Sequence, residues 1–135
     1  MAFGPGSLPG AAAGAPAGVV DFRLARNAVL ADYRKGRLSR IDVCDAQPEL
    51  LRNAIHCGRP SVEPCPICDA SMVLVTYVFG SRLPASGRCI TSLEELAKLD
   101  RGATEYAAYV VEVCGDCSWN HLVRSFPVGR RGRTR

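Results

Sequence analysis

The sequence predicts an α+β fold, in which an N-terminal three-helix unit is followed by an antiparallel β-sheet with a short helical insertion. Apolar residues recur at helical spacing between residues 21 and 58, and capping or turn residues divide this segment into three short helices. Later segments are rich in Val, Thr, Tyr and Phe, which is typical of strands. We therefore expect a helical unit over residues 19–59 and a sheet domain over residues 60–128.

Both ends of the chain differ in composition from this body. Residues 1–18 consist mainly of Gly, Ala, Pro and Ser and cannot build a core, so we predict a disordered tail. This segment has neither the basic start nor the apolar stretch of a secretory signal. No apolar run approaches the roughly 20 residues that span a bilayer. We expect a cytoplasmic protein without membrane contact, which ends in a short basic tail over residues 129–135.

The charge is uneven along the chain. The net charge is +4, and four of the 17 basic residues lie in residues 130–135. Residues 19–59 carry eight basic and five acidic side chains, whereas residues 60–129 carry five basic and eight acidic ones. This pattern predicts a basic helical unit, an acidic sheet domain and a basic end.

The three helices have recognisable starts and stops. Asp21 is placed to cap a helix that runs to Lys35, and Ser39 to cap a second helix from Arg40 to Asp45. Pro48 suits the first turn of a third helix, which runs from Glu49 to Cys57 and ends at Gly58. The residues expected to face inward are Phe22, Ala25, Val29 and Tyr33 in the first helix, and Leu50, Leu51, Ala54 and Ile55 in the third.

The sheet domain begins after a predicted linker, Arg59 to Pro66, which contains three prolines. Ser92 and Glu95 have the spacing of a capping box and predict a short inserted helix. The predicted strands are Met72 to Phe79, Tyr106 to Val113, and Trp119 to Phe126.

Two Cys-x-x-Cys pairs flank these strands, Cys65-Pro-Ile-Cys68 and Cys114-Gly-Asp-Cys117. Two thiolates so spaced can supply one edge of a tetrahedron, and two such turns supply the four ligands that structural zinc requires. The strands lead away from the first turn and back to the second. This is the arrangement of a zinc ribbon with one structural Zn²⁺, in which four protein ligands leave no open position for catalysis.

Other interpretations of the cysteine pairs remain open at this stage. A dithiol redox motif also uses Cys-x-x-Cys, but such a thiol gains from a helix N-terminus, and a strand is expected after Cys117. An iron–sulfur cluster is a further alternative. The residue after each pair is often Gly because the backbone there is left-handed, whereas this chain has Asp69 and Ser118. Ser suits that conformation less well than Asp, so we expect the second turn to be less regular.

The remaining chemically active side chains are weaker candidates for ligands. His121 follows Cys117 by four residues and could replace a cysteine, but we expect it to pack beside the site. Cys89 is a weaker candidate for a ligand. Cys44 and Cys57 lie in the helical part and are expected to behave as small apolar residues.

Three stretches of sequence carry a resemblance to a known family. They are Val43-Cys-Asp-Ala-Gln-Pro-Glu-Leu-Leu-Arg52, Cys65-Pro-Ile-Cys68 and Leu74-Val-Thr-Tyr-Val-Phe-Gly80. Together they resemble an actinobacterial family of small zinc-ribbon-like proteins of unknown function, over roughly residues 20–127. The resemblance implies lineage and cytoplasmic residence, and it implies no activity.

No catalytic constellation is visible, so we expect a protein that is not an enzyme. The leading hypothesis is an adaptor or regulator that docks on a nucleic-acid machine, RNA polymerase or the ribosome, through a protein or ribonucleoprotein partner. Its basic tail would contact phosphates through Arg130, Arg131, Arg133 and Arg135.

Two further hypotheses need different surfaces. A sequence-specific DNA-binding protein would use the third helix, with Arg52 and Asn53 reaching the bases. A pure protein-interaction module would need neither these residues nor the tail, and its acidic sheet domain would meet a basic partner.

Overall fold

The computed structural model of the chain describes residues 18–129. The predicted tails, residues 1–18 and 129–135, lie outside the described part except for Gly18 and Gly129. The elements in chain order are β1 (Val20–Asp21), α1 (Arg23–Arg34), α2 (Arg40–Val43), α3 (Pro48–Cys57), β2 (Arg59–Pro64), β3 (Ser71–Phe79), β4 (Arg88–Cys89), α4 (Leu93–Asp100), β5 (Tyr106–Val113) and β6 (Asn120–Val128). This is a mixed α+β fold, as the sequence predicts. No helix among these elements is both long and apolar enough to span a membrane.

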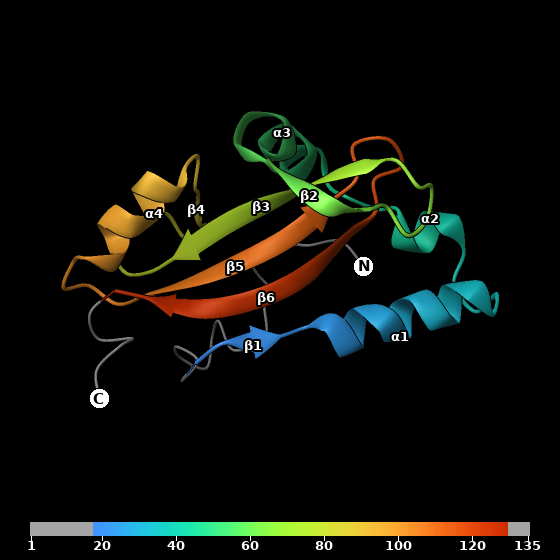
Figure 1. The fold of residues 1–135 in the computed structure, drawn as a ribbon, viewed down its shortest axis with the longest axis horizontal. Coiled ribbons are helices and arrows are strands. Elements are labelled where there is room, and N and C mark those ends of the chain that lie inside the picture. The colour runs from blue at the N-terminus through green and yellow to red at the C-terminus, as the bar shows by residue number, and fades with distance from the viewer. Residues whose placement is uncertain (1–17, 130–135) are drawn as a thin grey trace.

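One antiparallel sheet organises the described residues. Its strand order is β1-β6-β5-β3-β2, and β4 pairs with the end of β3 (Figure 1). The central pair, β3 and β5, runs in register from Val73 opposite Val113 to Phe79 opposite Ala107. The three predicted strands are confirmed, with ends that differ by at most two residues. Alternation along β3 and β5 gives both faces of the sheet apolar side chains, so both faces can be covered.

The predicted helices are also present, but α1 begins with Phe22 rather than the predicted Asp21 at its N-cap position. Ser39 caps α2 and exchanges hydrogen bonds with Asp42, which closes a capping box. The box predicted at Ser92 is only half formed, because the Glu95 carboxylate accepts from Thr91 rather than from the backbone of Ser92. The start of α3 at Pro48 is the predicted one within a residue.

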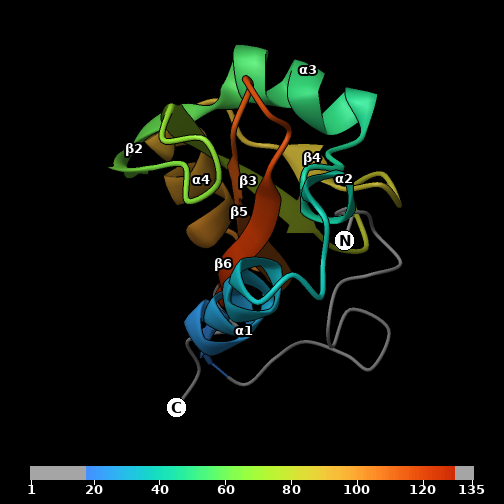
Figure 2. The same ribbon diagram turned by 90° about the vertical axis from the view of Figure 1, so that its right-hand side faces the viewer.

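The three N-terminal helices do not form a unit of their own, and this part of the predicted fold is wrong. α1 lies along β6, whereas α3 packs against β3 and β5 on the other side of the sheet (Figure 2). The sheet offers a broad apolar surface, so each helix buries its apolar side chains there instead of against other helices. Leu50 and Ala54 of α3 pack against Val75 and Val111 in this way.

The inward faces of the helices differ from the predicted stripes. In α1 the buried residues are Arg26 and Leu30, while Leu24 and Ala25 are exposed. In α3 the predicted inward residue Ile55 is exposed to solvent. The charged side chain of Arg26 is therefore buried in α1, and a pattern of apolar residues cannot predict this.

The segment predicted as a linker is the edge strand β2. Its pairing with β3 includes Pro60 opposite Val73 and is interrupted by a register shift before Pro64. Proline lacks a backbone N–H and is tolerated at an edge, where one side of the strand needs no donor. The prolines thus indicate an edge strand rather than a linker.

A buried ion pair attaches α1 to the sheet. The Nε of Arg26 lies 2.6 Å from Oε2 of Glu112 on β5, and the two side chains are only 8% and 4% exposed. Trp119 donates from its indole nitrogen to the same oxygen at 2.7 Å. Glu112 faces α1, whereas its neighbours Val111 and Val113 face the side covered by α3. One carboxylate therefore joins the helix, the central strand and the start of β6.

We predict that Arg26→Met lowers the free energy of unfolding by about 3–5 kcal/mol, because it leaves the Glu112 charge buried without its partner. Urea denaturation followed by circular dichroism measures the loss. Arg23→Met is the matched control, because Arg23 pairs with Glu63 at the surface, where a pair contributes at most about 1 kcal/mol. Equal losses in the two variants would contradict the assignment of Arg26–Glu112 as the main attachment of α1.

Candidate metal centre

Each Cys-x-x-Cys pair occupies a turn between two antiparallel strands. The first turn joins β2 to β3, and the second joins β5 to β6. In the first, the N–H of Cys65 donates to the carbonyl of Ala70 at 2.7 Å, and the N–H of Asp69 donates back to Cys65 at 2.9 Å. In the second, the N–H of Cys114 donates to the carbonyl of Trp119 at 2.9 Å, and the N–H of Ser118 donates to the carbonyl of Cys114 at 3.0 Å. The two turns thus repeat one hydrogen-bond pattern.

The residue after each pair has a left-handed backbone, as expected, with φ of 69° at Asp69 and 75° at Ser118. The prediction that the second turn is less regular is wrong. Its two backbone hydrogen bonds match those of the first turn within 0.2 Å. These bonds hold Ser118 in a conformation that its side chain alone would not favour.

The register of the sheet brings the two turns together. Val73, near the start of β3, lies opposite Val113 at the end of β5. The first turn directly precedes β3 and the second directly follows β5, so both lie at the same end of the central strand pair. The 45 intervening residues return the chain to this end through α4 and β5.

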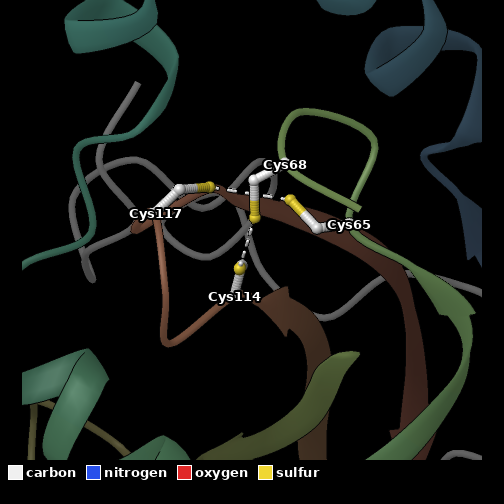
Figure 3. A group of neighbouring side chains, drawn as sticks. All are labelled: Cys65, Cys68, Cys114 and Cys117. Carbon is white, nitrogen blue, oxygen red and sulfur yellow. Dashed lines mark hydrogen bonds between the residues drawn. The ribbon is translucent and has the colours of Figure 1, made fainter. Parts of the chain in front are cut away.

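The four thiols converge on one point (Figure 3). Their sulfur atoms all lie within 4.8 Å of one another. Two of these separations are 3.6 Å between Cys65 and Cys117 and 3.5 Å between Cys68 and Cys114. A tetrahedral ion with metal–sulfur bonds of about 2.3 Å has sulfur–sulfur edges of about 3.8 Å. The four cysteines are therefore spaced to hold a metal ion between the two turns.

The surroundings of the thiols differ. Burial raises the pKa of Cys65 and of Cys117, whereas a backbone hydrogen bond at Ala70 lowers the pKa of Cys68. Metal ligation requires thiolates, so a bound cation must displace protons from the buried sulfurs and compensate their charge. A backbone N–H, that of Ile67, also points to the Cys65 sulfur at 3.4 Å and favours its charged form.

His121 lies beside the centre and outside the four-thiol set. Its Nδ1 is 2.8 Å from the carbonyl oxygen of Leu122, which can only accept, so this nitrogen carries the proton. Its ring stacks on Trp119, with centroids 6.0 Å apart and planes at 17°. The ring therefore packs beside the turn, which agrees with the sequence-based expectation.

A fifth cysteine, which sequence reasoning placed among the small apolar residues, also reaches the centre. The sulfur of Cys44, the residue that directly follows α2, lies 3.5 Å from the sulfur of Cys117. No local pattern in the sequence indicates this contact, because the two residues are 73 positions apart. The last two cysteines, Cys57 and Cys89, lie outside the cluster of four, and burial raises the pKa of Cys89.

The residues predicted to contact nucleic acid are separated from the centre or lie outside the described part. Arg52 is exposed on α3. The side-chain amide of Asn53 donates to the Tyr77 hydroxyl at 2.8 Å and thereby holds α3 on the sheet. The four arginines of the tail, Arg130, Arg131, Arg133 and Arg135, are outside the described residues.

Fold and centre together define a small α+β protein in which a four-thiol cluster ties two strand-connecting turns. The chain belongs to DUF5318, a family of unknown function, whose model matches residues 15–135. It is similar to the uncharacterized protein Mb0050 of Mycobacterium bovis and to the uncharacterized protein Rv0049 of Mycobacterium tuberculosis. Each is 45% identical over 111 residues, which cover 82% of this chain and 81% of the relative. No solved structure matches the chain.

These comparisons confirm the predicted resemblance to a family of unknown function, and the relatives named are mycobacterial. The names of the family and its relatives do not mention a metal or a ribbon. The metal assignment therefore depends on the geometry of the four thiols.

We predict that Cys114→Ser removes the bound metal and unfolds the sheet, because metal affinity in such sites contributes on the order of 10 kcal/mol to folding. Metal content by elemental analysis and sheet content by circular dichroism measure the two effects. Cys57→Ser, which alters a half-buried thiol outside the cluster, should retain both the metal and the sheet signal. A Cys114→Ser protein that keeps its sheet signal without metal would refute a structural role for the centre.

Proposed function

We propose that the chain is a non-enzymatic zinc-ribbon protein of the cytoplasm. In this proposal it docks on a nucleic-acid machine, RNA polymerase or the ribosome, as an adaptor or regulator. One Zn²⁺ held by Cys65, Cys68, Cys114 and Cys117 stabilises the fold. A cluster of exposed basic residues at the metal end of the molecule carries the docking part of the proposal.

The donor set supports zinc as the bound ion. Four thiolates in a tetrahedron select zinc or iron among the common metals, and zinc forms the closed structural sites of this kind. Because four protein ligands fill the coordination sphere, the ion would hold the two turns and take no substrate. Elemental analysis distinguishes zinc from iron directly, and a colourless protein excludes an iron–sulfur cluster.

The arrangement of the thiols favours a metal over dithiol redox chemistry. The two Cys-x-x-Cys pairs join in one set of four instead of forming two separate dithiols. Neither pair stands at the start of a helix, since strands β3 and β6 follow the turns. Neither pair is therefore followed by the helix whose N-terminus lowers the pKa of a redox thiol.

The turn between α1 and α2 supplies the basic surface. Arg34, Lys35, Arg37 and Arg40 lie within seven residues and are all exposed. Arg37 faces Asp32 at 3.4 Å, and the other three have no ion pair within residues 18–129. Such a cluster attracts phosphates, because each neutralised phosphate releases condensed counterions.

This basic turn lies at the same end of the molecule as the metal centre. Tyr33, directly before it, and Leu38, within it, pack against the cluster that includes Cys65, Cys114 and Trp119. The metal would thus hold the turn in a fixed position. The single supporting observation is this contiguity of basic turn and thiol cluster.

The alternative of a sequence-specific DNA-binding protein requires α3 as the recognition helix. In that hypothesis Arg52 and Asn53 reach the bases, yet the Asn53 amide is engaged by Tyr77. α3 also lies on the face of the sheet opposite α1, so the three helices do not form the support that a helix-turn-helix needs. The observations favour the basic turn over α3.

The pocket beside α4 gives no support for an enzyme. It is lined by Arg88, Cys89, Thr91, Ser92, Glu94, Glu95, Lys98 and Arg101. Of the two carboxylates in it, Glu95 accepts hydrogen bonds from Thr91 and pairs with Arg88, and these contacts lower its pKa. A catalytic acid or base instead needs a pKa near the working pH.

We predict that the triple variant Arg34→Ala/Lys35→Ala/Arg40→Ala weakens binding to RNA and lowers the dependence of log Kd on log salt by about 2–3 units, since three phosphate contacts are lost. Fluorescence anisotropy with labelled ribosomal RNA fragments measures the slope. The matched control, Arg82→Ala/Lys98→Ala/Arg101→Ala, removes three cations near α4 at the opposite end and should leave the slope unchanged.

Deletion of residues 130–135 tests the tail separately, and an unchanged slope would exclude it as a phosphate contact. Purification of the tagged chain from its host, with and without nuclease, then identifies the machine. Capture of ribosomal or polymerase subunits supports the proposal. Capture of neither, together with an unchanged slope in the triple variant, would refute it in favour of a pure protein-interaction module.

A further inference from the structure

Cys44 is held against the second cysteine turn by contacts of the two residues that follow it. The N–H of Ala46 donates to the carbonyl of Ser118 at 3.0 Å. The side chain of Asn120 donates to Asp45 at 3.1 Å. Since residues 45 and 46 are fixed in this way, the 3.5 Å approach of the Cys44 sulfur to Cys117 is a built contact and not an accident of a free side chain.

Cys44 is a neighbour of the metal centre without being one of its ligands. The four sulfurs that lie mutually within 4.8 Å do not include it, although it lies closer to Cys117 than Cys65 does. Four thiolates complete the coordination of the proposed ion. Cys44 is therefore a thiol that stays available while its neighbour is bound to the metal.

We propose that Cys44 and Cys117 form an oxidisable thiol pair, which a hydroperoxide converts to a disulfide with release of the metal. This modification site depends on the proposed zinc centre for its consequence, but the disulfide itself depends only on the position of the two sulfurs. Both side chains are half-buried and so remain accessible to a small oxidant.

The chemistry balances in two steps. The Cys117 thiolate attacks the O–O bond of the peroxide, which forms an S–O bond and releases hydroxide, so that Cys117 becomes a sulfenic acid and no longer serves as a thiolate ligand. The Cys44 thiol then attacks that sulfur, an S–S bond forms, and the oxygen leaves as water with the thiol proton. The two sulfurs lose two electrons in total, and the peroxide accepts them.

Cys44 is better placed than Cys65 to resolve the sulfenic acid. The Cys65 sulfur is almost as near, at 3.6 Å, but Cys65 is buried and itself one of the four ligand thiols. Cys44 is bound to nothing that must first dissociate. Bond formation needs the Cys44 sulfur to approach from 3.5 Å to the length of an S–S bond, about 2.05 Å.

The experiment compares the zinc-loaded full chain with Cys44→Ser and with Cys57→Ser during treatment with hydrogen peroxide. A chromogenic chelator reports zinc release, and mass spectrometry of proteolytic peptides locates disulfides. We expect a disulfide between Cys44 and Cys117 in the wild type and in Cys57→Ser, with recovery of the full zinc content after reduction and addition of zinc. In Cys44→Ser we expect this disulfide to be absent, Cys117 to accumulate as sulfinic acid, and the recovery of zinc to be lost.

The outcomes separate this proposal from the proposed function. A wild-type disulfide within a Cys-x-x-Cys pair or between Cys65 and Cys117, with Cys44 reduced, would overturn it, as would equal zinc recovery in the wild type and Cys44→Ser. If the isolated chain holds no zinc but still forms the Cys44–Cys117 disulfide, the oxidisable pair stands and the zinc proposal fails. Cys44→Ala serves as a second variant if Cys44→Ser does not fold.

Discussion

The convergence of four thiols at one end of the central strand pair is the constraint on which the other features depend. Cys65 and Cys68 lie in the turn between β2 and β3, and Cys114 and Cys117 lie in the turn between β5 and β6. An ion bound by all four would therefore join the two turns. Thiolates this close repel one another, and a bound cation would compensate their charge. A chain of 135 residues buries a limited core, so such a closure has a large share in its stability.

Glu112 links the second cysteine turn to helix α1. Its carboxylate accepts from Trp119, which directly follows the second cysteine turn, and from Arg26 of α1. A shift of the turn would therefore move the acceptor on which the buried guanidinium depends. Because an unpaired buried charge is costly, α1 and the centre are held in one arrangement. On the other face, α3 depends on apolar contacts and on the bond between Asn53 and Tyr77, and it is less directly linked to the cysteines.

The sequence predicted what short-range patterns encode. The three long strands and the two Cys-x-x-Cys motifs follow from neighbours within a few residues, and the strands between the motifs predicted that the two turns meet. Two other contacts between distant residues escaped prediction, because no local pattern reports them: Arg26 meets Glu112 across 86 positions, and Cys44 meets Cys117 across 73. The predicted assembly of the three helices into one unit was wrong for the same reason. β2 was missed because its prolines also fit a linker.

The basic turn, α2 and the thiol cluster form a continuous packing unit, and this links the two proposals. Leu38 precedes α2, Val43 ends it, and both pack with Cys114 and Trp119. α2 has only four residues and cannot persist without this support. Loss of the metal would therefore release the end of the turn that carries Arg40, and oxidation at Cys44 would act on the docking surface through the same short helix. A docking surface built in this way is present only while the centre is intact.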